Sequence, residues 1–336
     1  MKKGIIFDLD ETLGYFSQFS IFWYSLTNML TTIKKQNIIN QSLFNKCLDL
    51  YPEFLRYKIL YVLNYIKEYK IKTNNFLVFI YTNNQGDNQW INYVVNYLQY
   101  KINFKLFDRV IKSYKIGDKI VEPKRTSYNK KYIDFINITG MSINAKLIFF
   151  DDLYHKDMLN KNLTYVKLYP YQHDLTYNII ISRFINSNII DFNKLLYNKI
   201  QKEEQKQLLD EIIMKNFIRK ILTRMMTSYR YKFSYRKINH TKKDIEEFKR
   251  IFIHLKNFIN PTNTNVPYDT TNTNYPNYTT NTKNTIDVTK TNLKNTTFSK
   301  KLEKTNDKLQ INSHKKTKKN IADRAYSHRH LTDTIA

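Results

Sequence analysis

The stretch Gly4-Ile-Ile-Phe-Asp-Leu-Asp-Glu-Thr-Leu13 decides the fold, because its apolar run ends in two closely spaced carboxylates. A short run of this kind, over residues 4–9, predicts a buried β-strand. Asp8 and Asp10 stand two positions apart, so both leave the strand end on the same side. Two like charges with apolar residues behind them are costly unless a cation lies between them. The pair therefore predicts a metal site, although two solvated loop aspartates are the simpler alternative.

Further apolar runs rich in Ile, Val, Phe and Leu predict more buried strands. They cover residues 76–81, 106–112, 146–150 and 164–168. Helical patterns alternate with them over residues 42–70, 88–100 and 127–138. Strands that alternate with helices of this length indicate βαβ units, and hence an α/β fold with a parallel sheet. In such sheets ligands bind at the carboxyl ends of the strands.

Polar residues follow two of these runs, where a site is expected. Thr82 and Asn83 come after the second run, and their hydroxyl and amide groups suit hydrogen bonds to phosphate oxygens. Asp151 and Asp152 come after the fourth run and supply a second pair of carboxylates. Mg²⁺ is the natural partner, because it prefers one or two carboxylates together with substrate phosphate oxygens.

A lysine in the segment Pro123-Lys-Arg-Thr126 lies just before the helix expected at 127–138. Such a cation can neutralise the charge on a phosphoryl group during its transfer. Its spacing from Asp151 favours Lys124, while Lys130 and Lys131 are rivals and Arg125 is adjacent.

These signals, in this order, resemble the haloacid dehalogenase (HAD) superfamily of aspartyl-phosphate-forming hydrolases over about residues 1–180. The form Asp8-Leu-Asp-Glu-Thr-Leu13 is most similar to the CTD-type phosphatases, the NLI-interacting-factor-like group. Large DNA viruses encode similar domains, so a viral source fits. The resemblance implies a three-layer Rossmannoid sheet with a small cap or none, and Mg²⁺-dependent hydrolysis of phosphomonoesters.

The resemblance also implies a role for each matching residue. Asp8 would be the nucleophile, and Asp10 the general acid and base. Lys124 would be the catalytic lysine, and Thr82 would bind phosphate with help from Asn83. Four aspartates would hold Mg²⁺: Asp8, Asp10 through its backbone carbonyl, Asp151 and Asp152. Asp151 either shares the metal or holds the lysine.

Motif spacing bears on the substrate. Only 41 residues separate Thr82 from Lys124 and 69 separate Thr12 from Thr82, so at most a small helical cap is expected. A lightly capped site admits a macromolecular phosphoester, such as a phosphoprotein. One alternative is a nucleic-acid 3′-end phosphatase with the same chemistry. Another is a catalytically silent fold that serves as a scaffold for nucleic acid.

Charge indicates the class of partner. The 336 residues carry 55 Lys and Arg against 29 Asp and Glu, a net charge of +26. Residues 201–336 hold 28 basic and 13 acidic residues, so +15 of this charge falls in the shorter part. Such a surface attracts nucleic acid or another polyanion, although an AT-rich genome also favours lysine codons. The single cysteine excludes an internal disulfide framework and fits a reducing compartment.

No membrane segment is expected, because the uncharged stretch 12–33 contains many Ser, Thr and Asn residues. The start of the sequence lacks the features of a secretory signal. We therefore expect an intracellular protein, cytoplasmic or nuclear and not secreted.

Composition divides the chain into three parts: a phosphatase domain at 1–190, a basic helical extension at 191–260, and a tail at 261–336. In the extension, one helical face carries Leu208, Ile212, Phe217 and Ile221, and packs on the core or binds a partner. Asn and Thr supply 22 of the 40 residues at 261–300, which predicts disorder. The basic run at 315–319 is a candidate nuclear-import or polyanion site.

Overall fold

The computed structural model describes residues 3–73, 76–86, 88–192, 207–233 and 242–261. Residues Met1–Ile259 belong to one compact unit. This unit includes described residues on both sides of the boundary expected at residue 190, and that boundary stays a prediction. The predicted disordered tail and its basic run lie outside the described residues.

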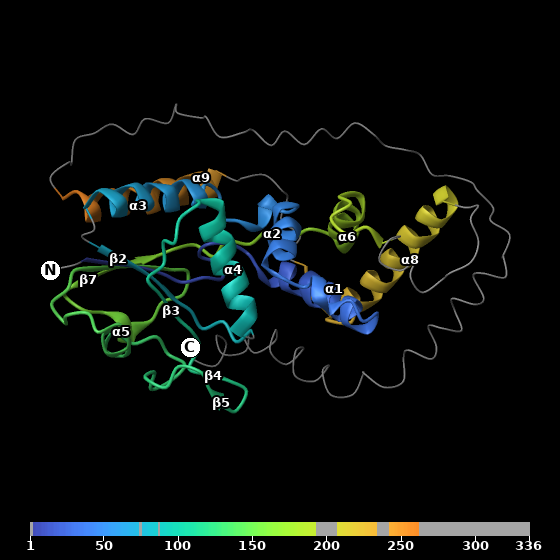
Figure 1. Cartoon of the computed structure of the whole chain (residues 1–336). Helices are drawn as coiled ribbons and strands as arrows, with labels where there is room; N and C mark the ends of the chain where they lie inside the picture. The colour runs from blue at the N-terminus through green and yellow to red at the C-terminus, as the bar shows by residue number, and fades with distance from the viewer. Residues whose placement is uncertain (1–2, 74–75, 87, 193–206, 234–241, 262–336) are drawn as a thin grey trace. The chain divides into compact units, whose positions relative to one another are not determined.

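A five-stranded parallel sheet lies toward one end of this unit (Figure 1). Its strands are β1 (Lys3–Phe7), β2 (Phe76–Tyr81), β3 (Arg109–Ile111), β6 (Leu147–Asp151) and β7 (Leu163–Lys167). Their spatial order is β3-β2-β1-β6-β7, and every neighbouring pair is parallel. Each strand overlaps one of the predicted runs, so the α/β class and the parallel sheet are confirmed.

The strand order places a topological switch point at the carboxyl end of β1. From β1 the chain proceeds outward to β2 and β3, then returns to the opposite side of β1 for β6 and β7. Where connections leave neighbouring strands in opposite directions, ligands bind outside the carboxyl ends. Phe7 pairs with Ile80 on β2 and with Phe150 on β6, so the three strand ends lie at one level.

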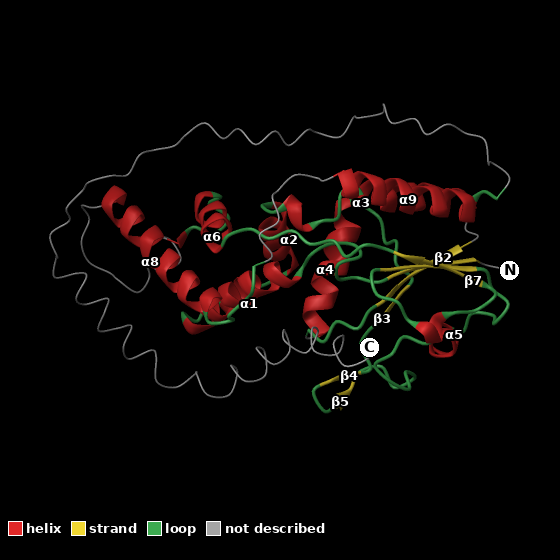
Figure 2. Cartoon of the chain, turned by 180° about the vertical axis from the view of Figure 1, so that it is seen from behind, coloured by secondary structure: helices red, strands yellow, loops and turns green. Residues whose placement is uncertain are grey.

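Helices cover both faces of the sheet (Figure 2). On one face, α3 (Ile59–Thr73) lies against β2 and α9 (Lys242–Ile259) lies against β6. The two helices pack through aromatic rings, with Phe252 of α9 contacting Tyr61 and Tyr65 of α3. On the other face, α5 (Tyr132–Thr139) buries Phe135 against Phe79 of β2.

The remaining long helices form a second core, which we call the helical lobe. It contains α1 (Ser17–Thr32), α2 (Gln41–Asp49), α6 (Tyr177–Asn186) and α8 (Gln207–Thr227), and α4 (Asn88–Lys101) adjoins it. Phe19 of α1 is fully buried, and its ring lies 5.3 Å from that of Phe44 and 6.1 Å from that of Trp90. The stretch 12–33 lacks charges because α1 is buried here. Among the described residues, no helix is both long and apolar enough to cross a bilayer.

The helix predicted over 42–70 is in fact two helices. α2 ends at Asp49, a 3₁₀ turn covers Pro52–Phe54, and α3 begins at Ile59. Proline has no backbone N–H to continue a helix. Lys58, with φ 54°, adopts a left-handed conformation that also interrupts it.

The predicted apolar face of the extension is only partly correct, because Phe217 and Ile221 are half-buried and other residues form the centre of the buried face. α8 buries Ile218, Leu222 and Met226, because it packs along this face against α1 and α6. Ile212, expected on the buried face, is 54% exposed.

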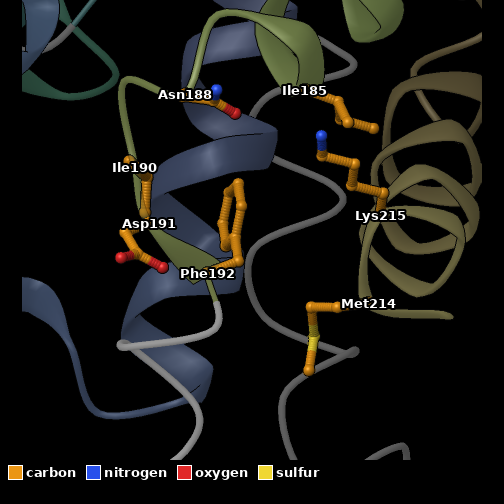
Figure 3. Close-up of a pocket in the computed structure, with 7 residues that line it drawn as sticks. All are labelled: Ile185, Asn188, Ile190, Asp191, Phe192, Met214 and Lys215. Carbon is orange, nitrogen blue, oxygen red and sulfur yellow. The ribbon is translucent and has the colours of Figure 1, made fainter. Parts of the chain in front are cut away.

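A cavity of about 360 Å³ opens between the end of α6 and α8 (Figure 3). Its lining residues are Ile185, Asn188, Ile190, Asp191, Phe192, Met214 and Lys215. None of the predicted site residues lines it. The cavity is therefore separate from the candidate site described next.

Candidate active site

Three carboxylates meet at the carboxyl ends of β1 and β6. Asp8 follows β1, Asp151 is the last residue of β6, and Asp152 follows it. One oxygen from each lies within 4.8 Å of the others, and all three residues are less than a tenth exposed. The structure therefore brings together three of the four aspartates predicted as metal ligands.

The lysine in this cluster is Lys130. Its Nζ donates to Asp8 Oδ1 at 2.5 Å and to Asp151 Oδ2 at 2.6 Å, and the side chain is 2% exposed. Lys124, which the spacing favoured, is exposed, and its Nζ lies 3.4 Å from the carbonyl oxygen of Asn137. We correct the choice of lysine accordingly. Asp151 takes the second of its two expected roles, because it holds the lysine.

The start of α5 explains the correction. The helix begins at Tyr132, five residues later than expected. Lys130 and Lys131, rather than Lys124, therefore directly precede it, and the side chain of Lys130 reaches the cluster. The preceding loop is tied to the first turn of α5, because Asp134 accepts from the backbone N–H of Thr126 at 2.9 Å. The N–H of Lys131 donates to the Tyr81 hydroxyl at 3.1 Å, which fixes this loop against β2.

The cluster has more negative than positive charge. Three carboxylates and one ammonium sum to −2 when all are ionised. Burial raises the pKa of Asp8 well above its ordinary range, and the attraction of Lys130 does not cancel this effect. Burial and the charge of Asp151 raise the pKa of Asp152 to about 6. Burial acts in the same direction on Asp151, but Lys130 and His155 outweigh it and lower its pKa.

This imbalance fits a divalent cation. Buried charges of one sign are stable only when paired, protonated or bound to a metal. The pKa values of Asp8 and Asp152 are raised because burial and the neighbouring carboxylates disfavour their ionised forms. A cation of charge +2 with a preference for oxygen ligands would balance the cluster. Asp8 and Asp152 are the better ligands, because both oxygens of Asp151 already accept hydrogen bonds, from Lys130 and from the Leu153 N–H.

Thr12 supports Asp152 and was given no role from the sequence. Its hydroxyl donates to Asp152 Oδ1 at 3.0 Å and lies 3.2 Å from the Asp152 N–H. The signal in the sequence that could have identified Thr12 as a site residue is its position in the Asp-x-Asp-x-Thr pattern.

Arg56, which carried no signal in the sequence, supports the turn after Asp10. This buried guanidinium donates to the carbonyl oxygens of Glu11 and Thr12, and to that of Tyr169 at 2.7 Å. Glu11 adopts φ 58° in the turn. Arg56 therefore fixes the backbone between Asp10 and Thr12.

The loop after β2 brings the predicted phosphate-binding residues beside β1. Thr82 is 1% exposed, and its hydroxyl accepts from the Asn84 N–H at 3.0 Å. Arg125, also buried, donates to the Thr82 carbonyl at 3.1 Å and to Asn83 Oδ1 at 2.7 Å. The structure thus gives Arg125 a supporting contact with this loop.

The Asp10 side chain faces this loop rather than the other aspartates. Asp10 Oδ2 accepts a hydrogen bond from Asn84 Nδ2 at 2.6 Å. Among the described residues, the carboxylate group that could hold a metal ion consists of Asp8, Asp151 and Asp152. The expected role of Asp10 as a ligand through its backbone carbonyl stays a prediction.

No protein-family model, curated protein or solved structure matches the chain. We therefore infer the function of the chain from its residues and their geometry.

Proposed function

We propose that this protein is a Mg²⁺-dependent phosphomonoester hydrolase that works through an aspartyl phosphate on Asp8, as its resemblance to HAD phosphatases implies. The observation that carries the proposal is the Lys130 ammonium between Asp8 and Asp151, beside Asp152. Phosphoryl transfer uses a nucleophile and a fixed cation, which a buried carboxylate and Lys130 supply here. Both lie at the switch point of the sheet, where ligands bind, and the excess of negative charge there suits a metal ion.

In the first step, an oxygen of Asp8 attacks phosphorus while the bond from phosphorus to the leaving oxygen breaks. Asp10 gives its proton to that leaving oxygen, so an alcohol departs and an acyl phosphate remains on Asp8. Lys130 neutralises negative charge at the reacting centre, and Thr82 and Asn83 hold the phosphoryl oxygens.

In the second step, Asp10 takes a proton from water, whose oxygen attacks the phosphorus. The bond between phosphorus and Asp8 breaks, which releases phosphate and restores the carboxylate. Asp8 and Asp152 would hold Mg²⁺, with Asp10 contributing its carbonyl. When bound, the ion supplies positive charge to the phosphoryl oxygens.

The test is hydrolysis of p-nitrophenyl phosphate with and without Mg²⁺, by the wild-type chain and by Asp8→Asn. We expect release that requires Mg²⁺ and falls by about 10⁴-fold or more in the variant, because the nucleophile is lost. Thermal unfolding of Asp8→Asn checks that it folds. Full activity in a folded Asp8→Asn chain would reject Asp8 as the nucleophile. No turnover together with no Mg²⁺ binding would favour the silent scaffold.

We further propose a phosphoprotein as the substrate class. In the described part of the segment between Thr82 and Lys130, the insertion beyond α4 and β3 is a short hairpin, β4 (Lys115–Ile116) and β5 (Lys119–Ile120). A hairpin of this size adds no cap domain to this segment, which favours a macromolecular substrate. Cleavage of a phosphopeptide should exceed that of a 3′-phosphorylated oligonucleotide. The reverse preference, with a steep loss of activity on adding salt, would indicate a nucleic-acid substrate.

A further inference from the structure

We propose that Asn84 is a positioning residue that orients Asp10 as the general acid, an inference that rests on the proposed phosphatase function. The residue lies two positions beyond Thr82, in the loop that follows β2. From the sequence, its amide, like that of Asn83, suits hydrogen bonds to phosphate oxygens. Its side chain instead holds the group that must deliver a proton to the leaving oxygen.

The contact is direct and short. Asn84 Nδ2 donates to Asp10 Oδ2 at 2.6 Å, and both residues are half-buried. An amide N–H can only donate, so Oδ2 accepts in either protonation state of Asp10. The proton that Asp10 donates is therefore carried on its other oxygen, Oδ1. Anchoring one oxygen also fixes the plane of the carboxyl group, and with it the direction in which Oδ1 transfers the proton.

The orientation of the Asn84 amide is itself fixed. Its Oδ1 accepts from the Gly86 N–H at 2.7 Å, so its nitrogen must be the atom that faces Asp10. Its backbone N–H donates to the Thr82 hydroxyl at 3.0 Å. The same short turn therefore sets the positions of the phosphate-binding hydroxyl and of the general acid relative to each other.

Gly86 is required for this arrangement. A Cβ at residue 86 would lie 2.7 Å from Asn84 Oδ1 and 2.7 Å from Cδ1 of Trp90. Any side chain there must displace the Asn84 amide or the Trp90 ring. Gly86→Ala is thus a second way to disturb Asn84 without changing an atom of Asp10.

The experiment compares leaving groups. A general acid matters most when the leaving oxygen is basic and least when it is a good leaving group. We would measure kcat/KM for phenyl phosphate and p-nitrophenyl phosphate, because this ratio reports the step that forms the aspartyl phosphate. Asn84→Ala should lower kcat/KM by up to about 10²-fold for phenyl phosphate and by less than about threefold for p-nitrophenyl phosphate. Asp10→Asn should show the same pattern more strongly, and Gly86→Ala more weakly.

Asn83→Ala is the matched control. It removes the same type of side chain from the adjacent position, where Asn83 Oδ1 accepts from Arg125 rather than facing Asp10. The loss of kcat/KM in Asn83→Ala should be equal for the two substrates, since phosphate binding does not depend on the leaving group. Thermal unfolding checks that each variant folds.

Equal losses for the two substrates in Asn84→Ala, or no loss, would overturn the role of Asn84 while the phosphatase function stands. If the wild-type chain hydrolyses neither aryl phosphate, the proposed function fails and this inference fails with it. If Asn84→Ala does not fold, the role of Asn84 is tested with Gly86→Ala, by the same comparison of kcat/KM for phenyl phosphate and p-nitrophenyl phosphate.

Discussion

The carboxyl edge of the sheet and the helical lobe both bury polar groups, but they satisfy them differently. In the lobe, Gln18 donates to the Leu175 carbonyl at 2.6 Å and accepts from the Leu175 N–H at 2.8 Å. The Tyr51 hydroxyl donates to the Ile180 carbonyl at 2.7 Å. These groups are neutral and find partners within the chain, so they stabilise one conformation.

At the carboxyl edge, Asp8 and Asp151 share the Lys130 ammonium, and the Asp152 carboxylate lies beside them. Burial leaves this cluster short of positive charge, which is costly for stability. Under the proposed function, this loss of stability is offset when a cation and a phosphoryl group bind to the site. Substitutions at the edge should therefore abolish activity, whereas substitutions in the lobe should reduce stability and leave the activity of the folded chain intact.

After the nucleophile Asp8, the largest effect is expected for Lys130. Lys130→Met should lower kcat/KM for p-nitrophenyl phosphate by about 10³-fold, because it removes the charge beside the reacting group. Lys124→Met is the matched control, and its activity should stay within about twofold of wild type, since Lys124 is exposed and bonded elsewhere. Equal losses in the two variants would contradict the geometry of the cluster.

In the lobe, Phe19→Ala should lower the free energy of unfolding by about 3–5 kcal/mol, because it leaves a cavity among packed rings. Chemical denaturation measures this change. The kcat of the folded fraction should match wild type. A large loss of kcat in chains that remain folded would show that the lobe takes part in the reaction.

The metal-free chain should lose stability as pH rises through about 6. The folded-state pKa of Asp152 is raised to about 6, above the unfolded value, and that of Asp8 is raised as well. Their protonated forms therefore favour the fold at low pH, and this contribution disappears as they ionise. The effect should be about 1–3 kcal/mol between pH 5 and 7.

Added Mg²⁺ should reverse this trend at pH 7, because it binds the ionised carboxylates of the folded chain. Thermal unfolding at several pH values, with Mg²⁺ or with a chelator, measures both effects. Asp152→Asn should flatten the dependence on pH. A chelated chain that grows more stable from pH 5 to 7 would argue against uncompensated charge in the cluster.

The smallest effect is expected for the ion pair of the lobe, in which Arg183 binds both oxygens of Glu53. The pair is partly exposed, so Glu53→Gln should cost less than about 1 kcal/mol of unfolding free energy at pH 7. Because the pKa of Glu53 is lowered, the contribution is present at neutral pH and lost in acid. Denaturation at pH 7 and pH 3 checks this; a larger cost at pH 3 than at pH 7 would contradict it.

The sheet and most of the site follow from local sequence patterns. Parallel strands that are buried on both faces read as continuous apolar runs, and their carboxyl ends meet at one edge. This is why Asp8, Thr82, Asp151 and Asp152 were found together. Lys124 was favoured over its rival Lys130 because helix boundaries are uncertain in sequence, and the expected helix start was five residues too early.

The supporting residues were harder to find. Arg56 and Arg125 act through backbone carbonyls of segments distant in sequence. Every residue has such a carbonyl, so no residue type in the sequence marks the partner. The buried face of α8 depends on where α1 and α6 lie, which its own sequence does not specify.

The most direct test of the central claim is to trap the phosphoryl group on the chain. Excess wild-type protein with Mg²⁺ would be mixed with radiolabelled p-nitrophenyl phosphate and quenched in acid. The account predicts label that hydroxylamine releases, that peptide mapping assigns to Asp8, and that Asp8→Asn lacks. Turnover without label on Asp8, or label on another residue, would contradict it.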